Sequence, residues 1–176
     1  AQTPTLDRIA RNGVTFENAY CNSPLCVPSR MSFCTGRYVT RIGAVDNWFA
    51  LASHEPTLAH MVRKSGYIPY LSGKMHFLGP DCEHGFELLS GSYSHPLKRG
   101  GQWRDFADVY CNTRDRDRRF ADFGAFESSK TIEHDLPITE GCVDFLRARK
   151  EQKDRTPYFL IAGYSSPHFP ISVPKE

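Results

Sequence analysis

One pattern occurs three times along this chain: a short amphipathic helix is followed directly by an apolar strand. The helices are predicted over residues 5–13, 57–66 and 139–150, and the strands over 14–20, 67–72 and 158–164. The last strand, YFLIAGY, is apolar throughout, which is typical of strands inside parallel sheets. Pro69 predicts that the middle strand is short or lies near an edge. The alternation predicts an α/β fold, in which a central, mostly parallel or mixed sheet is flanked by helices.

The composition is that of a globular chain, and it excludes some partners. Of 176 residues 40% are hydrophobic, so the chain can bury a substantial core. The 22 basic and 20 acidic residues nearly cancel, and the densest charge run, residues 114–119, alternates in sign, so nucleic acid is not expected as a partner. No apolar run approaches the roughly 20 residues that span a bilayer, so a membrane is not expected either.

The helix and strand pattern is lost between about residues 90 and 134. Gly, Ser, Arg and Asp alternate there with scattered aromatic residues. Linkers rarely carry so many aromatic residues, so this stretch is predicted to be an insertion or a substrate-side loop. It is expected to belong to one domain that takes in residues 1–176.

Polar residues follow two of the predicted strands. Lys74 and His76 lie between two glycines after the second strand, and their spacing puts both side chains on one side of extended backbone. His168 follows the third strand, in a loop with a proline on each flank. Ligands of open α/β sheets bind beyond the carboxyl ends of strands, so these residues are candidates for an anion site.

The stretch CNSPLCVPSRMSFCTG supplies the other half of this candidate site. Pro28 suits the first position of a helix, which Gly36 would end, so Cys26 is expected at the helix N-terminus. Free N–H groups and Arg30 would both favour an oxyanion beside that thiol. The six cysteines form no C-x-x-C pair, which argues against a zinc or dithiol site, and Cys21 and Cys34 are expected to be packing residues with free thiols.

Each of these residues also has an ordinary structural interpretation. A lone cysteine is more often a small buried apolar residue, and a lone lysine in a loop is more often solvated. Their common position at strand ends and a helix start, and their convergence on one class of ligand, favour the oxyanion site.

The motifs resemble those of the type I sulfatases of the alkaline phosphatase superfamily. The family signature C-x-P-S-R followed by T-G matches residues 26–30 and 35–36, and the signature G-Y then G-K-x-H matches residues 66–67 and 73–76. The lead-in TPTLDRIARNGVTFENAY and the loop SSPHFP are similar to family segments as well, in the same order. Within this family, the segments CNSPLC and SGKMHFLGPD most resemble those of choline sulfatase-like members.

The resemblance implies hydrolysis of a small-molecule or saccharide sulfate ester. In such enzymes a formylglycine-generating enzyme converts the signature cysteine to formylglycine, whose hydrated aldehyde attacks sulfur and later releases sulfate. A divalent cation, usually Ca²⁺ and alternatively Mg²⁺ or Mn²⁺, lowers the pKa of the attacking hydroxyl and neutralises sulfate charge.

The resemblance also assigns roles by position. Cys26 would be the formylglycine precursor and a metal-bound nucleophile, and Arg30 would stabilise it. Lys74 would contact formylglycine and sulfate, His76 would assist release of sulfate, and His168 would bind sulfate or protonate the leaving oxygen. Asn47 matches a substrate-binding amide of choline sulfatase-like and phosphonate-hydrolase relatives, although an Asp-Asn pair is also typical of a turn.

The metal site that the family uses is incomplete in this sequence. Its aspartate ligands precede the first matched motif and its Asp and His or Asn ligands follow the last, so N- and C-terminal parts of the fold are expected to be missing. Two other functions stay open. One is hydrolysis of phosphonate monoesters or phosphodiesters, although those relatives tend to replace the Lys-x-His pair; the other is oxyanion binding without catalysis.

Overall fold

The computed structural model describes residues 2–89, 93–95, 123–168 and 171–175. Its helices are α1 (Pro4–Arg11), α2 (Cys26–Thr35), α3 (Val39–Ile42), α4 (Leu58–Lys64) and α7 (Lys130–Glu151). Its strands are β1 (Ile68–Leu78), β2 (Glu87–Leu88), β3 (Tyr93–His95), β4 (Gly124–Phe126), β5 (Tyr158–Gly163) and β6 (Ser172–Pro174). Across the described parts of the chain, no helix has the length and apolar character needed to cross a membrane.

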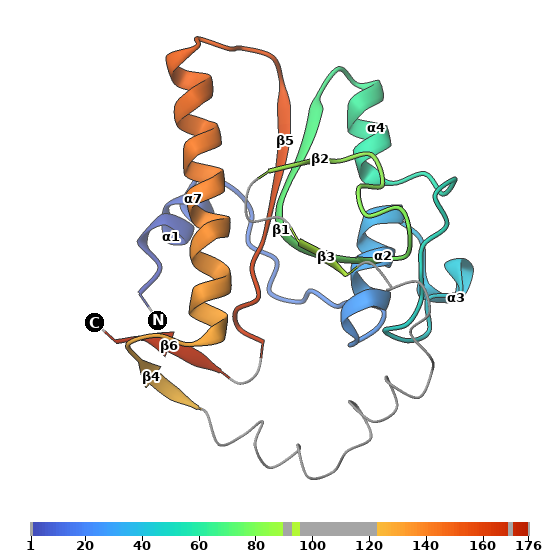
Figure 1. The fold of residues 1–176 in the computed structure, drawn as a ribbon, viewed down its shortest axis with the longest axis horizontal. Coiled ribbons are helices and arrows are strands. Elements are labelled where there is room, and N and C mark those ends of the chain that lie inside the picture. Colours follow the sequence, from blue (N-terminus) through green and yellow to red (C-terminus); the bar gives the residue numbers. More distant parts are fainter. Residues whose placement is uncertain (1, 90–92, 96–122, 169–170, 176) are drawn as a thin grey trace.

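Strand β1 is the centre of a parallel sheet (Figure 1). It pairs with β5 from Ile68 opposite Tyr158 to Gly73 opposite Gly163. Strand β2 pairs with β1 at residues 70–71, and β3 pairs with its later part at residues 74 and 78. Strands β4 and β6 form a separate parallel pair. The predicted α/β fold with a mostly parallel sheet is therefore confirmed.

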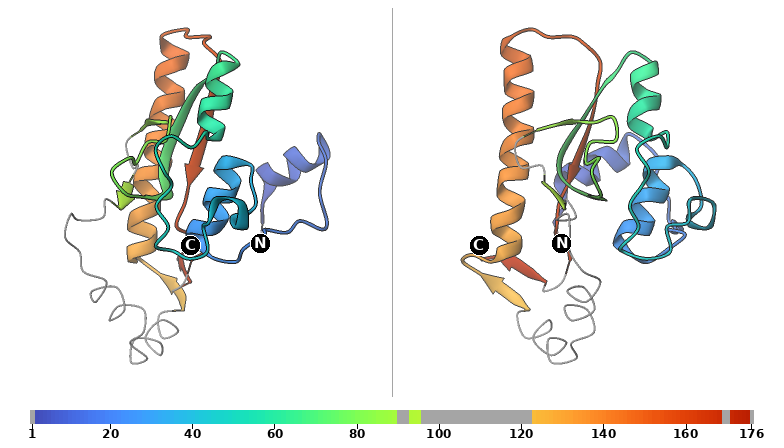
Figure 2. Two further views of the ribbon diagram at one scale, coloured as in Figure 1. Left: turned by 90° about the vertical axis from the view of Figure 1, so that its right-hand side faces the viewer. Right: turned by 45° about the vertical axis from the view of Figure 1, so that its right-hand side comes forward.

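Helices cover both faces of this sheet. Helix α7 lies on one side, and α2 and α4 lie on the other (Figures 1 and 2). On the α2 and α4 side, a buried apolar cluster joins the two helices to β1, and its members include Val27, Met31, Ala59, Leu71 and Phe77. On the α7 side, Ile138 is fully buried and Ser72 donates a hydrogen bond to its carbonyl oxygen.

Two predicted elements differ from the structure near the start of the chain and in β1. Residues 14–20 form no strand, and the side chains of Val14, Phe16 and Tyr20 are exposed; an isolated strand is not stable, and no described strand pairs with this segment. Strand β1 was predicted to end at residue 72 but continues to Leu78. The central position of β1 also corrects the expectation, drawn from Pro69, that this strand is short or lies near an edge. Proline has no N–H to donate, but Pro69 precedes the residues that pair with β2, so that pairing loses no hydrogen bond.

The third predicted helix is longer than its apolar pattern indicates. Helix α7 begins at Lys130 because Ser129 caps it, accepting a hydrogen bond from the Ile132 amide at 3.2 Å. The last part of the stretch predicted to be irregular, residues 90–134, therefore contains β4 and the first turn of α7. Residues 93–95 of that stretch form β3, and residues 90–92 and 96–122 lie outside the described residues. The helices predicted over 5–13 and 57–66 are confirmed as α1 and α4.

Two glycines allow β1 and β5 to approach closely at the end of their pairing. A Cβ on Gly163 would lie 2.2 Å from the Lys74 carbonyl oxygen, and a Cβ on Gly73 would lie 2.5 Å from the Gly163 carbonyl oxygen. Gly73 also has a φ of +88°, a conformation that other residues rarely adopt. Both positions therefore require glycine.

We expect Gly163→Ala to lower the free energy of unfolding by about 3 kcal/mol, because the clashing atoms are backbone and cannot rotate away. Urea denaturation of the natural protein that contains these residues measures this. Gly66→Ala is the control: it has a positive φ but no atom within 4 Å of its Cβ, and should cost about 1 kcal/mol. Equal losses in the two variants would contradict the close approach.

Candidate active site

Cys26 is the first residue of α2, as the sequence predicts for a helix N-terminus. Pro28 was expected to be the first helical residue. It is the third, because the helix begins two residues earlier, at Cys26. A proline is tolerated there because the N–H groups of the first turn have no partner within the helix. Cys26 is half-buried, and no acidic residue lies in its helical turn. The thiol therefore lies at the positive end of the helix with no carboxylate of α2 competing for that site.

The other two cysteines of this stretch behave differently from one another. Cys34 is buried as predicted, and burial raises the pKa of its thiol to about 12, so it does not ionise near neutral pH. Cys21 is exposed, so the prediction that it is a packing residue was wrong. The described cysteines are free thiols, as expected.

Asn47 holds the start of α2 from outside the helix. Its Oδ1 accepts a hydrogen bond from the Val27 amide at 2.9 Å, directly after Cys26. This satisfies an N–H that has no partner within the helix. The neighbouring Asp46 accepts from the Trp48 amide, so the Asp-Asn pair also forms the turn that such pairs favour. Asn47 therefore lies next to Cys26, and its amide oxygen is engaged by the backbone.

Arg30 joins the first turns of α2 to β1. Its Nη1 donates a hydrogen bond to the Lys74 carbonyl oxygen at 2.8 Å. The Lys74 side chain is half-buried, and burial lowers the pKa of its ammonium; a Cys26 thiolate opposes this shift and Arg30 adds to it. These interactions place Cys26, Arg30 and Lys74 in one electrostatic neighbourhood.

His76 follows Lys74 on the same strand. The half-buried Lys74 and His76 alternate with buried Met75 and Phe77, so the first pair does not face the apolar core. His76 has a φ of +63°, which departs from a regular strand. The position of the His76 side chain therefore does not follow from extended backbone alone.

His168 lies in the loop after β5 and is exposed. Its amide donates to the Ser165 carbonyl oxygen at 2.9 Å, which forms a turn. Since β1 and β5 are parallel and pair up to Gly73 and Gly163, this loop leaves the sheet at the level where Lys74 begins. The sequence missed Asp135, which binds the amides of this loop, because it lies between the stretch predicted to be irregular and the start of the predicted third helix.

The described residues do not provide a complete metal site. Among them, no group of three or more His, Cys, Asp or Glu side chains could hold a metal ion. A cation held by Cys26 in its modified form would need further ligands, as the sequence indicated. Ca²⁺, Mg²⁺ or Mn²⁺ therefore stays a prediction, and the chemistry below is argued without it.

The fold is that of the alkaline phosphatase and sulfatase class, and comparisons with known proteins agree. A phosphonate monoester hydrolase from Silicibacter pomeroyi superposes with a TM-score of 0.62 at 22% identity, over 98% of this chain and 38% of that one. The family model "Sulfatase" matches residues 1–176, and the chain therefore belongs to the sulfatase family.

Two curated relatives show how much of such a protein is present. A sulfatase of Formosa agariphila is 32% identical over 99% of this chain and 36% of its own length. A choline-sulfatase of Rhizobium meliloti is 48% identical over 48% of this chain and 16% of its own length. The matched segments thus cover 36% of the length of the first relative and 16% of the length of the second.

We expect Asn47→Ala to lower the free energy of unfolding by about 1 kcal/mol, because the Val27 amide loses its acceptor. Asn47→Asp keeps an acceptor and adds a negative charge at the helix N-terminus, so it should retain stability. Urea denaturation of both variants checks this. An Asn47→Ala variant with the same free energy of unfolding as the wild type would show that the Val27 hydrogen bond does not hold the start of α2.

Proposed function

We propose that the natural protein containing this chain hydrolyses a sulfate monoester at the site formed by Cys26, Arg30 and Lys74, after conversion of Cys26 to formylglycine. The observation that carries this proposal is the hydrogen bond from Arg30 to the Lys74 carbonyl oxygen, which brings two cationic residues together beside Cys26. Like charges held close raise each other's free energy unless an anion lies between them. A sulfate group supplies that anion.

Formylglycine at position 26 would supply a hydrated aldehyde as the nucleophile. Lys74 would neutralise negative charge on the sulfate oxygens, and Arg30 would hold the Lys74 backbone while adding positive charge at the helix start. His168, in the loop beyond β5, would donate a proton to the leaving alcohol oxygen, and His76 would take up the proton released when sulfate departs. Asn47 would keep residue 26 in place through the Val27 amide, with its amide nitrogen available for the substrate.

The substrate is proposed at the level of a small-molecule or saccharide sulfate ester. The segment shared with the choline-sulfatase relative supports a small alkyl sulfate such as choline sulfate as the first ester to assay. The partner during maturation would be a formylglycine-generating enzyme, which reads the C-x-P-S-R signature at residues 26–30.

Phosphonate monoester hydrolysis is the second candidate, and the fold shared with the Silicibacter pomeroyi enzyme favours considering it. Lys74 and His76 favour the sulfatase, because phosphonate-hydrolysing relatives tend to lack this pair. Kinetics on an aryl sulfate and an aryl phosphonate monoester with metal should give the larger kcat/KM for the sulfate. The reverse order would assign the protein to the second candidate, and inactivity on both would favour oxyanion binding without catalysis.

The modification can be read in a single peptide. Trypsin cleavage after Arg11 and Arg30 releases residues 12–30, which contain both Cys21 and Cys26. After co-expression with a formylglycine-generating enzyme, tandem mass spectrometry should show the aldehyde at Cys26 and an intact thiol at Cys21. Cys21 is the internal control, and a peptide with two intact thiols would exclude the formylglycine mechanism.

The pH dependence of kcat/KM tests the role of Lys74. A protonated ammonium is needed to bind sulfate, so activity should fall as pH rises through the pKa of Lys74. Burial and Arg30 lower that pKa, so the fall should begin below the ordinary lysine range; conversion of Cys26 to an aldehyde removes the opposing influence and keeps this direction.

Lys74→Arg should move the alkaline fall to higher pH, because a guanidinium stays charged. Lys64→Arg, in the exposed last turn of α4, is the control and should leave the profile unchanged. An identical profile in wild type and Lys74→Arg would contradict the assignment.

A further inference from the structure

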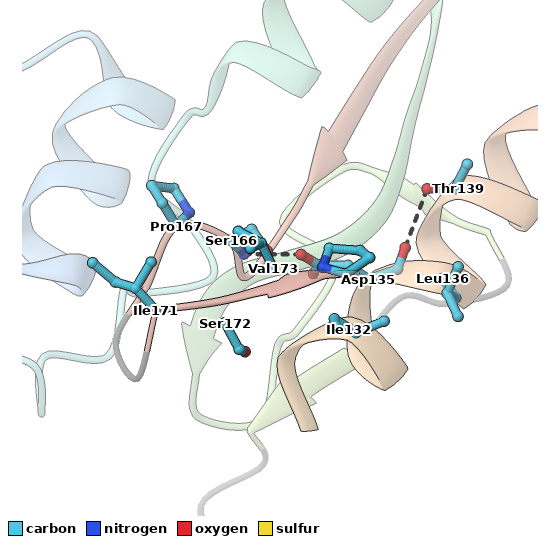
Figure 3. A pocket seen from close by; sticks show the side chains of 10 residues that line it. Ile132, Asp135, Leu136, Thr139, Ser166, Pro167, Ile171, Ser172 and Val173 are labelled. Carbon is cyan, nitrogen blue, oxygen red and sulfur yellow. Dashed lines mark hydrogen bonds between the residues drawn. The ribbon is translucent and has the colours of Figure 1, made fainter. Parts of the chain in front are cut away.

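Asp135 on α7 binds the loop that carries His168. Its Oδ1 accepts a hydrogen bond from the Ser165 amide at 2.7 Å, and its Oδ2 accepts from the Ser166 amide at 2.9 Å. Both carboxylate oxygens are thus used by consecutive backbone amides, and Figure 3 shows Asp135 directed at Ser166. Hydrogen bonds to a charged acceptor are stronger than neutral ones, so this pair fixes the path of the chain after β5.

The helical turn that carries Asp135 is itself attached to the central strand. Ser72 on β1 donates to the Ile138 carbonyl oxygen at 3.3 Å, and the Ile138 side chain packs against Gly73. Thr139, on the next turn, lies 3.1 Å from the Tyr164 hydroxyl by its Oγ1. Asp135 therefore holds the loop in register with the strand residues that precede Lys74.

The loop passes this restraint on to His168. The Ser165 carbonyl oxygen accepts the His168 amide, so the residue that Asp135 binds also closes the turn before the histidine. Without the carboxylate, two amide groups lose their acceptor and the turn can reorient. Displacement of a proton donor by about 1 Å is enough to slow catalysis by about 100-fold.

We infer that Asp135 is a positioning residue for His168, acting through the backbone amides of Ser165 and Ser166; the catalytic consequence rests on the proposed function. An asparagine at this position keeps one acceptor oxygen but turns an NH₂ donor toward the second amide. Asp135→Asn should therefore misplace His168 without removing it.

NMR spectroscopy of the natural protein provides a test that needs no activity, because the imidazole resonances of His168 report its surroundings. Asp135→Asn should shift them and speed hydrogen exchange at the Ser165 and Ser166 amides. Asp144→Asn is the matched control, since Asp144 is exposed on the same helix and pairs only loosely with Arg147 at 3.8 Å. Unchanged His168 resonances in Asp135→Asn would overturn the inference, whether or not the protein is a sulfatase.

Kinetics test the catalytic consequence. If His168 protonates the leaving oxygen, Asp135→Asn should lower kcat by about 10- to 100-fold for an alkyl sulfate and much less for 4-nitrophenyl sulfate, whose leaving group needs no proton. In a His168→Ala background the same substitution should have little further effect. A full, independent loss in that background would show that Asp135 acts elsewhere and would overturn the inference.

Circular dichroism of each variant checks that the fold is retained, so that a change in kcat or in the His168 resonances is not the result of unfolding. Asp135→Glu provides a second variant that keeps the charge one methylene farther out, and it should show a smaller shift of the His168 resonances than Asp135→Asn. An equal or larger shift with the glutamate would contradict positioning by the carboxylate. Wild-type inactivity on all sulfate esters would reject the proposed function and leave the NMR test decisive for Asp135.

Discussion

The carbonyl oxygen of Lys74 is the atom on which the arrangement of this site depends. Gly163 approaches it so closely that no side chain can be accommodated there, and Arg30 donates a hydrogen bond to the same oxygen. One contact fixes the spacing of β1 and β5, and the other fixes the first turns of α2 against β1. Because Lys74 follows directly on Gly73 and itself pairs with β3, the position of its backbone is set by sheet pairing and not by a flexible loop.

The candidate site is held mainly through backbone groups. Asn47 binds the Val27 amide, Arg30 binds the Lys74 carbonyl, and Asp135 binds the amides after β5. Each contact restrains the chain beside a residue proposed to act on sulfate, so that the reactive side chain stays available for the substrate. Positive charge predominates near the start of α2, since no acidic residue lies in its first turn and Lys74 interacts electrostatically with both Cys26 and Arg30.

Local sequence signals predicted α1, α4 and the apolar strand β5, because caps, glycine stops and apolar periods act within a few residues. They were wrong where the outcome depends on partners. Residues 14–20 have a strand-like composition but no strand among the described residues to pair with, and Pro69 indicated an edge although β1 has neighbours on both sides. The start of α7 was missed because Ser129 and not an apolar repeat determines it.

The sequence by itself determined the residue types of the site and the family to which the chain belongs, since C-x-P-S-R and G-K-x-H are short motifs that can be read without a structure. Only the tertiary structure decided how these residues are held. The hydrogen bonds of Asn47, Asp135 and Arg30 join residues that lie 20, 30 and 44 positions apart. Helix and strand periods carry no information over such separations, because the contacts form only when the sheet pairs and α2 and α7 pack against it.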